Sequence, residues 1–309
     1  MKILVTGGAG FIGSHIIKSM LKNGYEVVCI DSFDPYYDPI TKRNNISSFL
    51  PNNNFTLIEG DIADSTILMN AMQDCDYVFH QAAQAGVGIS VKQPKKAHET
   101  NASGTLNVLS ASLEAGVKKV INASSSSVYG TVKYLPFDEE HPTNPISPYG
   151  VSKLAAEHYC RVFSELYGLK TISLRYFTVY GPKMRPDLAI SIFTKAALNN
   201  NPLQIFGDGT KTRDFTYIDD VIEANIKAMK RGSGEYNIGG GHHISIQELA
   251  EKMITVNNSS SLIEYHPSVK GDADHTYANI SKAEKELEWK PKTTIFDGLV
   301  KYSTWVQKN

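Results

Sequence analysis

Lys2-Ile3-Leu4-Val5-Thr6 is a short apolar run that leads directly into Gly7-Gly8-Ala9-Gly10-Phe11-Ile12-Gly13, and an amphipathic stretch over 11–22 follows. This order predicts a buried β-strand, a tight glycine turn and a helix. Glycines in such a turn let backbone N–H groups approach a diphosphate, and the positive end of the helix dipole favours the same anion. The glycine spacing differs from the common G-x-G-x-x-G pattern, so the turn alone is also consistent with a plain strand-to-helix connection.

Short β-branched runs alternate with amphipathic runs throughout the first 175 residues. Strands that are apolar on both sides suit a parallel sheet with helices on both faces. The alternation therefore predicts an α/β fold with a doubly wound parallel sheet. The expected strands are 2–6, 26–30, 55–58, 77–80, 118–123 and 170–175, and the expected helices are 11–22, 65–72, 101–115 and 149–166.

Beyond residue 175 the alternation fades, and turn-rich stretches separate further helical patterns at 188–198, 219–229, 246–254 and 296–306. This predicts a smaller, mixed α/β lobe packed on the carboxyl edge of the sheet. We expect residues 1–175, joined by about 214–240, to form a dinucleotide-binding unit. Residues 176–309 are expected to form a substrate lobe interleaved with the first unit.

Composition excludes several classes of protein. The 309 residues include 31 basic and 32 acidic side chains, and no segment is basic enough to neutralise many phosphates of a nucleic acid. No stretch approaches the length of an apolar membrane span, and the N-terminus lacks the shape of a signal peptide, so a cytoplasmic protein is expected. The three cysteines are far apart and His242-His243 has no third ligand at suitable spacing, so neither disulfides nor a metal site are expected.

Acidic and small residues follow the next three expected strands. Asp31 ends the second strand, where a carboxylate accepts both ribose hydroxyls of adenosine and repels a 2′-phosphate, which favours NAD over NADP. Asp61-Ile62 follows the third strand, and Ala82-Ala83 follows the fourth, where small side chains let a cofactor lie close. Each feature alone is also consistent with an ordinary turn. Together, at one edge of the sheet, they predict dinucleotide binding.

A phenol and an ammonium stand four residues apart at Tyr149 and Lys153, and on a helix they share one face. The positive charge is expected to lower the pKa of the phenol and to make it a base for an alcohol proton. Tyr129 and Lys133 repeat this spacing, but Gly130 makes that stretch poor helix material, so Tyr129 is interpreted as structural.

Four serines, Ser124-Ser125-Ser126-Ser127, end the fifth expected strand. Their hydroxyls are placed to donate to a sugar hydroxyl or to the tyrosine oxygen. The alternative is a solvated serine loop.

The ordered set Gly7-x-x-Gly10-x-x-Gly13, Asp31, Asp61-Ile62, Asn101, Ser124–Gly130, Tyr149-x-x-x-Lys153, Arg175–Pro182 and Arg213-Asp214-Phe215 resembles the extended short-chain dehydrogenase/reductase family of nucleotide-sugar epimerases and dehydratases. The resemblance covers nearly the whole chain and implies a Rossmann-type fold, a homodimer and bound NAD. It implies that Ser125 is the catalytic hydroxyl, Tyr149 the base and Lys153 its partner. It implies cofactor contacts from Gly7, Gly10, Phe11, Ile12, Gly13, Asp31, Asp61, Ile62, Ala82, Ala83, Asn101, Tyr149, Lys153 and Tyr176.

The resemblance also implies a substrate, a UDP-sugar whose UDP half is held by Arg213 and Asp272. Dehydratases of the family carry an Asp-Glu pair beside the catalytic hydroxyl, and UDP-glucuronate decarboxylases carry a glutamate nearby. Ser126 and Ser127 stand here instead, which argues against elimination and decarboxylation.

The segment Gly181–Asp187 resembles the GPRMRPD segment of UDP-glucuronate 4-epimerases, and Thr178 replaces the asparagine usual in UDP-glucose 4-epimerases. An arginine fork suits a carboxylate because it can bond both oxygens. Arg185 is therefore the expected carboxylate anchor, helped by Ser126, Ser127 and Thr178, although a surface or phosphate-facing arginine is the alternative. We expect a UDP-glucuronate 4-epimerase. The alternatives are a UDP-glucose/galactose 4-epimerase, a UDP-glucuronate decarboxylase, and a cofactor-binding protein without turnover.

Overall fold

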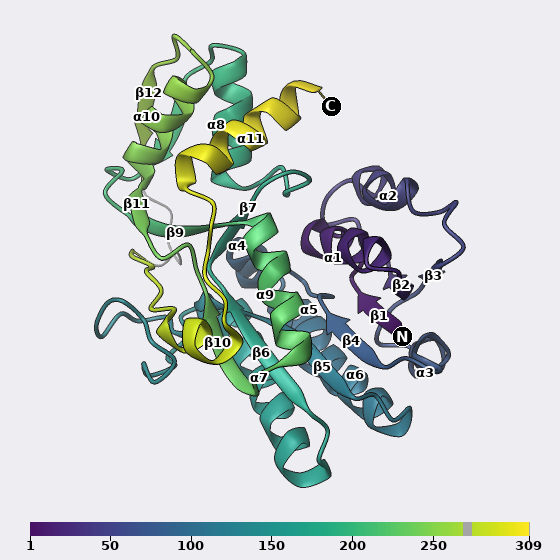
Figure 1. Cartoon of the computed structure of the whole chain (residues 1–309). Helices are drawn as coiled ribbons and strands as arrows, with labels where there is room; N and C mark the ends of the chain where they lie inside the picture. The colour runs from purple at the N-terminus through teal and green to yellow at the C-terminus, as the bar shows by residue number, and fades with distance from the viewer. Residues whose placement is uncertain (268–273, 309) are drawn as a thin grey trace.

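A computed structural model describes residues 1–267 and 274–308, and within them seven parallel strands form the central sheet in the order β10-β6-β5-β4-β1-β2-β3 (Figure 1). These strands are β1 (Lys2–Thr6), β2 (Glu26–Asp31), β3 (Phe55–Glu59), β4 (Tyr77–His80), β5 (Lys119–Ser125), β6 (Thr171–Tyr176) and β10 (Gly234–Ile238). The order reverses direction between β1 and β4. The predicted fold class, a doubly wound parallel sheet, is confirmed.

Alternate side chains of β1, β2 and β4 enter two separate apolar layers, as expected for a sheet covered on both faces. Ile3 and Val5 of β1 pack in one layer and Leu4 packs in the other. Helices α1 (Phe11–Lys22) and α9 (Ile218–Lys230) cover the first face and contact each other, and α3 (Ser65–Met72), α6 (Gly104–Glu114) and α7 (Pro148–Tyr167) cover the second (Figure 1). Helix α2 (Pro39–Ser47) packs beside α1.

The chain returns to this sheet after entering the lobe. Helix α9 packs on β5 and β6, and β10 extends the sheet beyond β6, with Gly234 opposite Ile172. Strand β10 was not predicted, because Gly-Glu-Tyr-Asn-Ile offers no continuous apolar run. The division of the chain at residue 175 stays a prediction.

One predicted helix differs from the structure. The predicted helix over 101–115 is α6, which begins at Gly104. Residues 101–103 belong to the π-helical segment η1 (Glu99–Ser103), which follows two helices that were not predicted, α4 (Val87–Lys92) and α5 (Pro94–His98). Asn101 lies in the π segment, where its buried side chain bonds two other segments. A π-helical turn contains more residues than an α-helical turn, so the side chain of Asn101 points inward at a position that α-helical periodicity does not predict.

The lobe contains two small sheets and three helices among the described residues. The first sheet is formed by β11 (His243–Ser245), β9 (Thr212–Tyr217) and β7 (Thr178–Tyr180), and the second by β12 (Ile263–His266) and β8 (Leu203–Phe206). The helices are α8 (Ala189–Leu198), α10 (Ile246–Val256) and α11 (Ile295–Lys308), and the π-helical segment η3 (Ala283–Leu287) precedes α11. Apolar residues of the lobe, such as Ile190 and Leu249, share one core with the face of the sheet that α1 covers.

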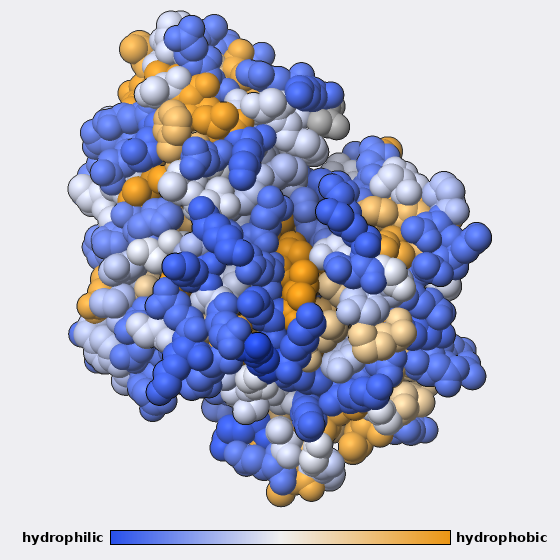
Figure 2. All heavy atoms as spheres, viewed as in Figure 1, coloured by the Kyte–Doolittle hydropathy of each residue, from blue (hydrophilic) through white to orange (hydrophobic). Residues whose placement is uncertain are grey.

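The surface in the same view is mainly hydrophilic, and apolar atoms show in a narrow strip between α1 and α9 and in a patch over the part of the lobe that contains α8 and α10 (Figure 2). None of the helices in the described part of the chain is both long and apolar enough to span a membrane.

Candidate active site

A cavity of about 620 Å³ lies along the carboxyl edge of the sheet, between the sheet and the lobe. Its walls come from the segments that follow β1 to β6, and it spans the point between β1 and β4 where the strand order reverses. Ligands of open α/β sheets bind at this place, because the loops after two neighbouring strands diverge there and leave a crevice.

Most of the residues predicted for the site line this cavity. They are Gly7, Gly10, Phe11, Ile12, Gly13, Asp31, Asp61, Ile62, Ala82, Ala83, Ser125, Ser126, Ser127, Tyr149, Lys153, Tyr176, Thr178, Arg185 and Arg213. Asp272 lies outside the described residues. The roles assigned to all of these residues stay predictions.

Asn101 is buried and does not line the cavity, and its predicted cofactor contact stays a prediction. Its Oδ1 accepts from the backbone N–H of Gln84 at 2.8 Å, and its Nδ2 donates to Ser152 Oγ at 2.9 Å. Ser152 Oγ in turn donates to the carbonyl of Tyr149 at 2.8 Å. Asn101 therefore ties the loop after β4 to the first turn of α7.

The glycine turn after β1 forms a close backbone cradle. A Cβ on Gly7 would lie 2.6 Å from the backbone nitrogen of Ala82, and one on Gly13 would lie 2.4 Å from the carbonyl oxygen of Gly7. Gly7 also has a φ of 64°, which favours glycine. Gly10 caps α1 without any side-chain hydrogen bond, so the first N–H groups of the helix are left for a ligand. This geometry fits the diphosphate of a dinucleotide.

Asp31 faces the same cradle from the end of β2. Its Oδ2 accepts from the backbone N–H of Ala9 at 3.0 Å, and its Oδ1 accepts from that of Phe33 at 2.9 Å. Burial raises the pKa of Asp31, while these N–H groups and the charge of Lys42 lower it. A carboxylate offers about four acceptor positions, so two remain for ribose hydroxyls. The residues present therefore fit NAD.

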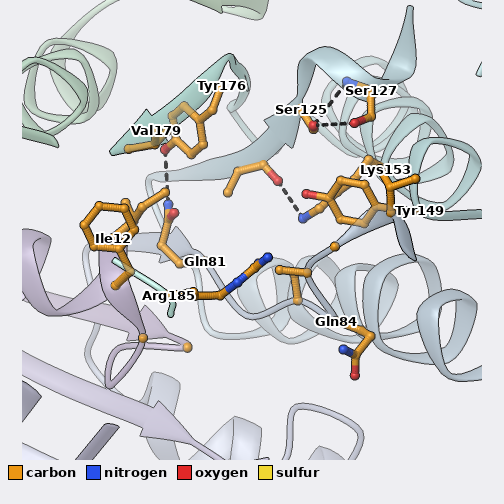
Figure 3. Close-up of a pocket in the computed structure, with 18 of the residues that line it drawn as sticks. Ile12, Gln81, Gln84, Ser125, Ser127, Tyr149, Lys153, Tyr176, Val179 and Arg185 are labelled. Carbon is orange, nitrogen blue, oxygen red and sulfur yellow. Dashed lines mark hydrogen bonds between the residues drawn. The ribbon is translucent and has the colours of Figure 1, made fainter. Parts of the chain in front are cut away.

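Helix α7 brings the catalytic candidates together. It begins at Pro148, with Ser147 Oγ accepting from the N–H of Gly150 at 3.1 Å. A Cβ on Gly150 would lie 2.4 Å from the carbonyl oxygen of Ser127, so a glycine at this position lets the helix lie directly against the serines after β5. Figure 3 shows Tyr149 and Lys153 extending from this helix toward the same space as Ser125 and Ser127.

Electrostatics at the phenol differ from the sequence expectation. Burial raises the pKa of Tyr149, whereas a hydrogen bond with Ser125 and the positive charge of Arg185 lower it. Lys153 instead donates from Nζ to the carbonyl of Ala123 at 2.8 Å, and burial lowers its pKa to about 8. The predicted net lowering of the Tyr149 pKa by Lys153 is therefore wrong for this structure, because desolvation of the phenol outweighs the nearby charges.

Arg185 reaches the cavity from the segment after β7, and its side chain extends toward Tyr149 (Figure 3). Its Nε and Nη2 donate to the two carboxylate oxygens of Asp187 at 3.0 and 3.1 Å. Tyr36 OH donates to the same carboxylate at 3.0 Å. None of the described residues hydrogen-bonds Nη1. Arg185 is therefore fixed at the cavity wall by Asp187, and the edge of its guanidinium that carries Nη1 remains available to a ligand.

The sequence analysis assigned no role to Asp187 or Tyr36, although both belong to or follow segments that it discussed. Asp187 ends the Gly181–Asp187 segment, and Tyr36 follows Asp31 at the edge of the sheet. Their proximity depends on two loops that are 151 residues apart in the chain. Arg213, which was predicted to hold UDP, donates from Nη1 to the carbonyls of Thr212 and Asp274.

Comparison with known proteins agrees with this geometry. The model of the GDP-mannose 4,6 dehydratase family matches residues 4–302. The chain is 38% identical over 311 residues to UDP-glucuronate 4-epimerase of Thermodesulfobacterium geofontis, covering 99% of this chain and 96% of that protein. It superposes on UDP-glucuronic acid 4-epimerase from Bacillus cereus, solved with UDP-glucuronic acid and NAD, with a TM-score of 0.95 at 40% identity, over 100% of this chain and 99% of the other. UDP-glucose 4-epimerase from Thermotoga maritima, solved with UDP-glucose, gives 0.93 at 37% identity, over 100% and 99%.

The chain belongs to the GDP-mannose 4,6 dehydratase family, a branch of the extended short-chain dehydrogenases/reductases. Within it, the chain is an NAD-dependent nucleotide-sugar 4-epimerase.

Proposed function

We propose that this enzyme interconverts UDP-glucuronate and UDP-galacturonate. The observation that carries the proposal is the Arg185 guanidinium in the cavity wall near Tyr149, with one edge unused. Asp187 occupies the Nε and Nη2 edge, so the terminal edge formed by Nη1 and the second hydrogen of Nη2 can bond both oxygens of a sugar carboxylate. Thr178 and Ser127 line the same cavity and offer further hydroxyl donors.

The residues around the sugar position supply proton transfer and orientation. NAD held by the glycine turn and Asp31 would supply hydride chemistry at carbon 4 of the sugar, as acceptor and then as donor to the opposite face. Tyr149 accepts the proton of the 4-hydroxyl as the ketone forms, and it returns that proton once the sugar has turned over in the cavity. Ser125 stabilises the phenolate by the hydrogen bond that already lowers the pKa of Tyr149.

Arg185 also acts on the 4-keto intermediate, where it prevents decarboxylation. A 4-keto uronic acid is a β-keto acid, which loses carbon dioxide when the breaking C–C bond aligns with the ketone π system. A carboxylate held by a fixed guanidinium edge is kept out of that alignment, so the acid group is retained.

The placement of acids in the cavity supports epimerisation over the related reactions. The carboxylates of the described cavity wall are Asp31, Asp34 and Asp61, and they follow β2 and β3 rather than β5. Among the described residues that line the cavity, no carboxylic acid follows β5 beside Ser125, Ser126 and Ser127, where it could assist elimination or decarboxylation. UDP-glucose/galactose 4-epimerisation is the second candidate, because it needs the same Tyr149 chemistry and a protein of that name is similar over the whole chain.

A substrate panel tests the proposal. Purified enzyme is given UDP-glucuronate, UDP-galacturonate, UDP-glucose or UDP-galactose in turn, and kcat/KM is measured for each by chromatographic separation of the products. The proposal predicts a higher kcat/KM for the two uronates than for the neutral sugars, with no UDP-pentose. A preference for UDP-glucose assigns the enzyme to the second candidate, and a product lacking the carboxylate assigns it to the decarboxylases.

We infer in addition that the enzyme is a cytoplasmic homodimer. Helix α7 leaves Val151, Tyr159 and Leu166 exposed on its outer surface, beside α6. A second copy would bury these side chains. Analytical ultracentrifugation of the native chain and of a Val151→Glu variant tests this, with a dimer expected for the first and a shift toward monomer for the second. A native monomer would contradict the inference.

A further inference from the structure

We infer that Glu157 and Arg175 are positioning residues that fix both ends of the serine loop, defined here as Ser125–Val128, and so set where the Ser125 hydroxyl lies relative to Tyr149. The inference rests on the proposed catalytic roles of Ser125 and Tyr149. It adds two charged residues that lie outside the cavity wall and that the proposed chemistry does not use.

The two residues form a buried ion pair one helical turn beyond Lys153 along α7. Glu157 follows Lys153 by four residues, as Lys153 follows Tyr149, so the three share one side of the helix. Arg175 lies in β6, where its Nε donates to Glu157 Oε1 at 2.9 Å and its Nη2 donates to Oε2 at 2.8 Å. Glu157 is 2% exposed and Arg175 is 5% exposed. A buried pair of this kind is a weak source of net stability, which makes a positional role the better account of it.

The front end of the serine loop is bonded to the carboxylate. Ser124, the residue before Ser125, donates from Oγ to Glu157 Oε1 at 2.5 Å. Ser124 is 3% exposed, so water does not compete for this bond. The last residue of β5 before the catalytic hydroxyl is therefore fixed to α7, the same helix that carries Tyr149.

The rear end of the loop is bonded to the guanidinium. Tyr129 follows Val128, and its hydroxyl accepts from Arg175 Nη1 at 3.0 Å and donates to Asn237 Oδ1 at 2.6 Å. Its ring stacks on Phe137 with centroids 4.7 Å apart. The tyrosine that repeats the Tyr-x-x-x-Lys spacing in the sequence thus holds the serine loop from behind.

Both ends of the serine loop are therefore hydrogen-bonded to the Glu157–Arg175 ion pair. Between them, Ser125 Oγ lies within hydrogen-bond distance of Ser127 Oγ, at 3.2 Å, and accepts from the N–H of Ser127 at 3.1 Å. Loss of either hydrogen bond would let the serine loop, and with it the Ser125 hydroxyl, shift relative to Tyr149. Displacement of a catalytic group by about 1 Å can cost up to about a hundredfold in rate.

The test cuts the bonds to the loop and leaves the ion pair intact, because Glu157 also raises the pKa of Lys153. Ser124→Ala removes the front bond, and Tyr129→Phe removes the rear bond while keeping the ring. Each is expected to lower kcat by about tenfold, with KM for the sugar nucleotide changed by less than about twofold. Ser124→Thr, which keeps a hydroxyl in a strand, is expected to restore kcat.

Two matched variants control for the loss of a buried hydroxyl. Ser112 is buried in α6 and donates to the carbonyl of Val108 at 2.7 Å, and Tyr302 is buried in α11 and hydrogen-bonds with Ser191. Ser112→Ala and Tyr302→Phe are expected to leave kcat unchanged, since neither hydroxyl contacts the serine loop.

A double-mutant cycle decides whether the effect passes through Ser125. If it does, Ser124→Ala and Tyr129→Phe lower kcat no further in a Ser125→Ala background. The same loss in that background, or no loss in either single variant, would overturn the inference. The assay uses UDP-glucuronate, or UDP-glucose if only the neutral sugar is turned over, so failure of the proposed substrate is seen separately from failure of the positioning role.

Discussion

Replacement of Arg185 by alanine should change substrate preference more than it changes catalysis in general. The terminal edge of the guanidinium offers two charge-assisted hydrogen bonds to a carboxylate, each worth about 1.5–3 kcal/mol. Asp187, left without its partner, is 45% exposed on its side chain, so water compensates most of that loss. We therefore expect kcat/KM for UDP-glucuronate to fall by roughly 10²–10⁴-fold, equivalent to about 3–6 kcal/mol.

The neutral sugar provides the internal reference. Arg185 lowers the pKa of Tyr149, so its removal makes the phenol a less available base for both substrates. UDP-glucose is expected to lose less than about tenfold, because it has no carboxylate to anchor. The assay is the ratio of the two kcat/KM values in native enzyme, in Arg185→Ala and in Lys183→Ala.

Lys183 is the matched control because it is a cation two residues away whose Nζ donates to the carbonyl of Asn45. The ratio should stay near the native value in Lys183→Ala and fall only in Arg185→Ala. Equal losses on the charged and neutral sugars in Arg185→Ala would refute the reasoning and would leave Arg185 with a general role near Tyr149.

Three further outcomes are expected. Tyr149→Phe should lose roughly 10²–10⁴-fold in kcat, with unchanged NAD content after purification, and full activity would remove Tyr149 as the base. Asp31→Asn should weaken NAD binding by roughly tenfold in calorimetric titration, and unaltered affinity would exclude a ribose contact. His80 is buried between Thr6 and Thr105, and burial lowers its pKa from 6.5 to about 3. Between these values the unfolded chain binds more protons than the native state, so stability is lost as the pH falls below 6.5. Urea unfolding at about pH 7 and about pH 5 should show a smaller loss in His80→Gln than in native protein, and parallel losses would contradict this origin.

The elements that carry a clear periodic signal could be predicted from the sequence. Strands β1 and β4 and helices α1 and α3 have the predicted bounds, and the other predicted strands differ by no more than two residues at either end. Their apolar faces are continuous in the sequence, so local patterning was sufficient. Strand β10 carries no such signal in its own sequence. It is extended because it pairs with β6, a contact that local patterning does not report.

Electrostatic detail in the cavity could not be predicted in the same way. The sequence places Lys153 one turn from Tyr149, but it does not show that Lys153 Nζ is directed to the carbonyl of Ala123. Nor does it show that Arg185 already has a carboxylate partner in Asp187. Both facts depend on where separate loops meet in the folded chain. The pKa of Tyr149 depends on burial, which helix spacing does not report.

An isotope measurement tests the central claim most directly. UDP-glucuronate deuterated at carbon 4 is incubated with the purified enzyme in ordinary water, without added NAD, and the product is followed by proton NMR and mass spectrometry. Internal hydride return predicts UDP-galacturonate that keeps both its carboxylate and the deuterium at carbon 4. Deuterium replaced by solvent hydrogen, or a product smaller by one carbon dioxide, would contradict the account.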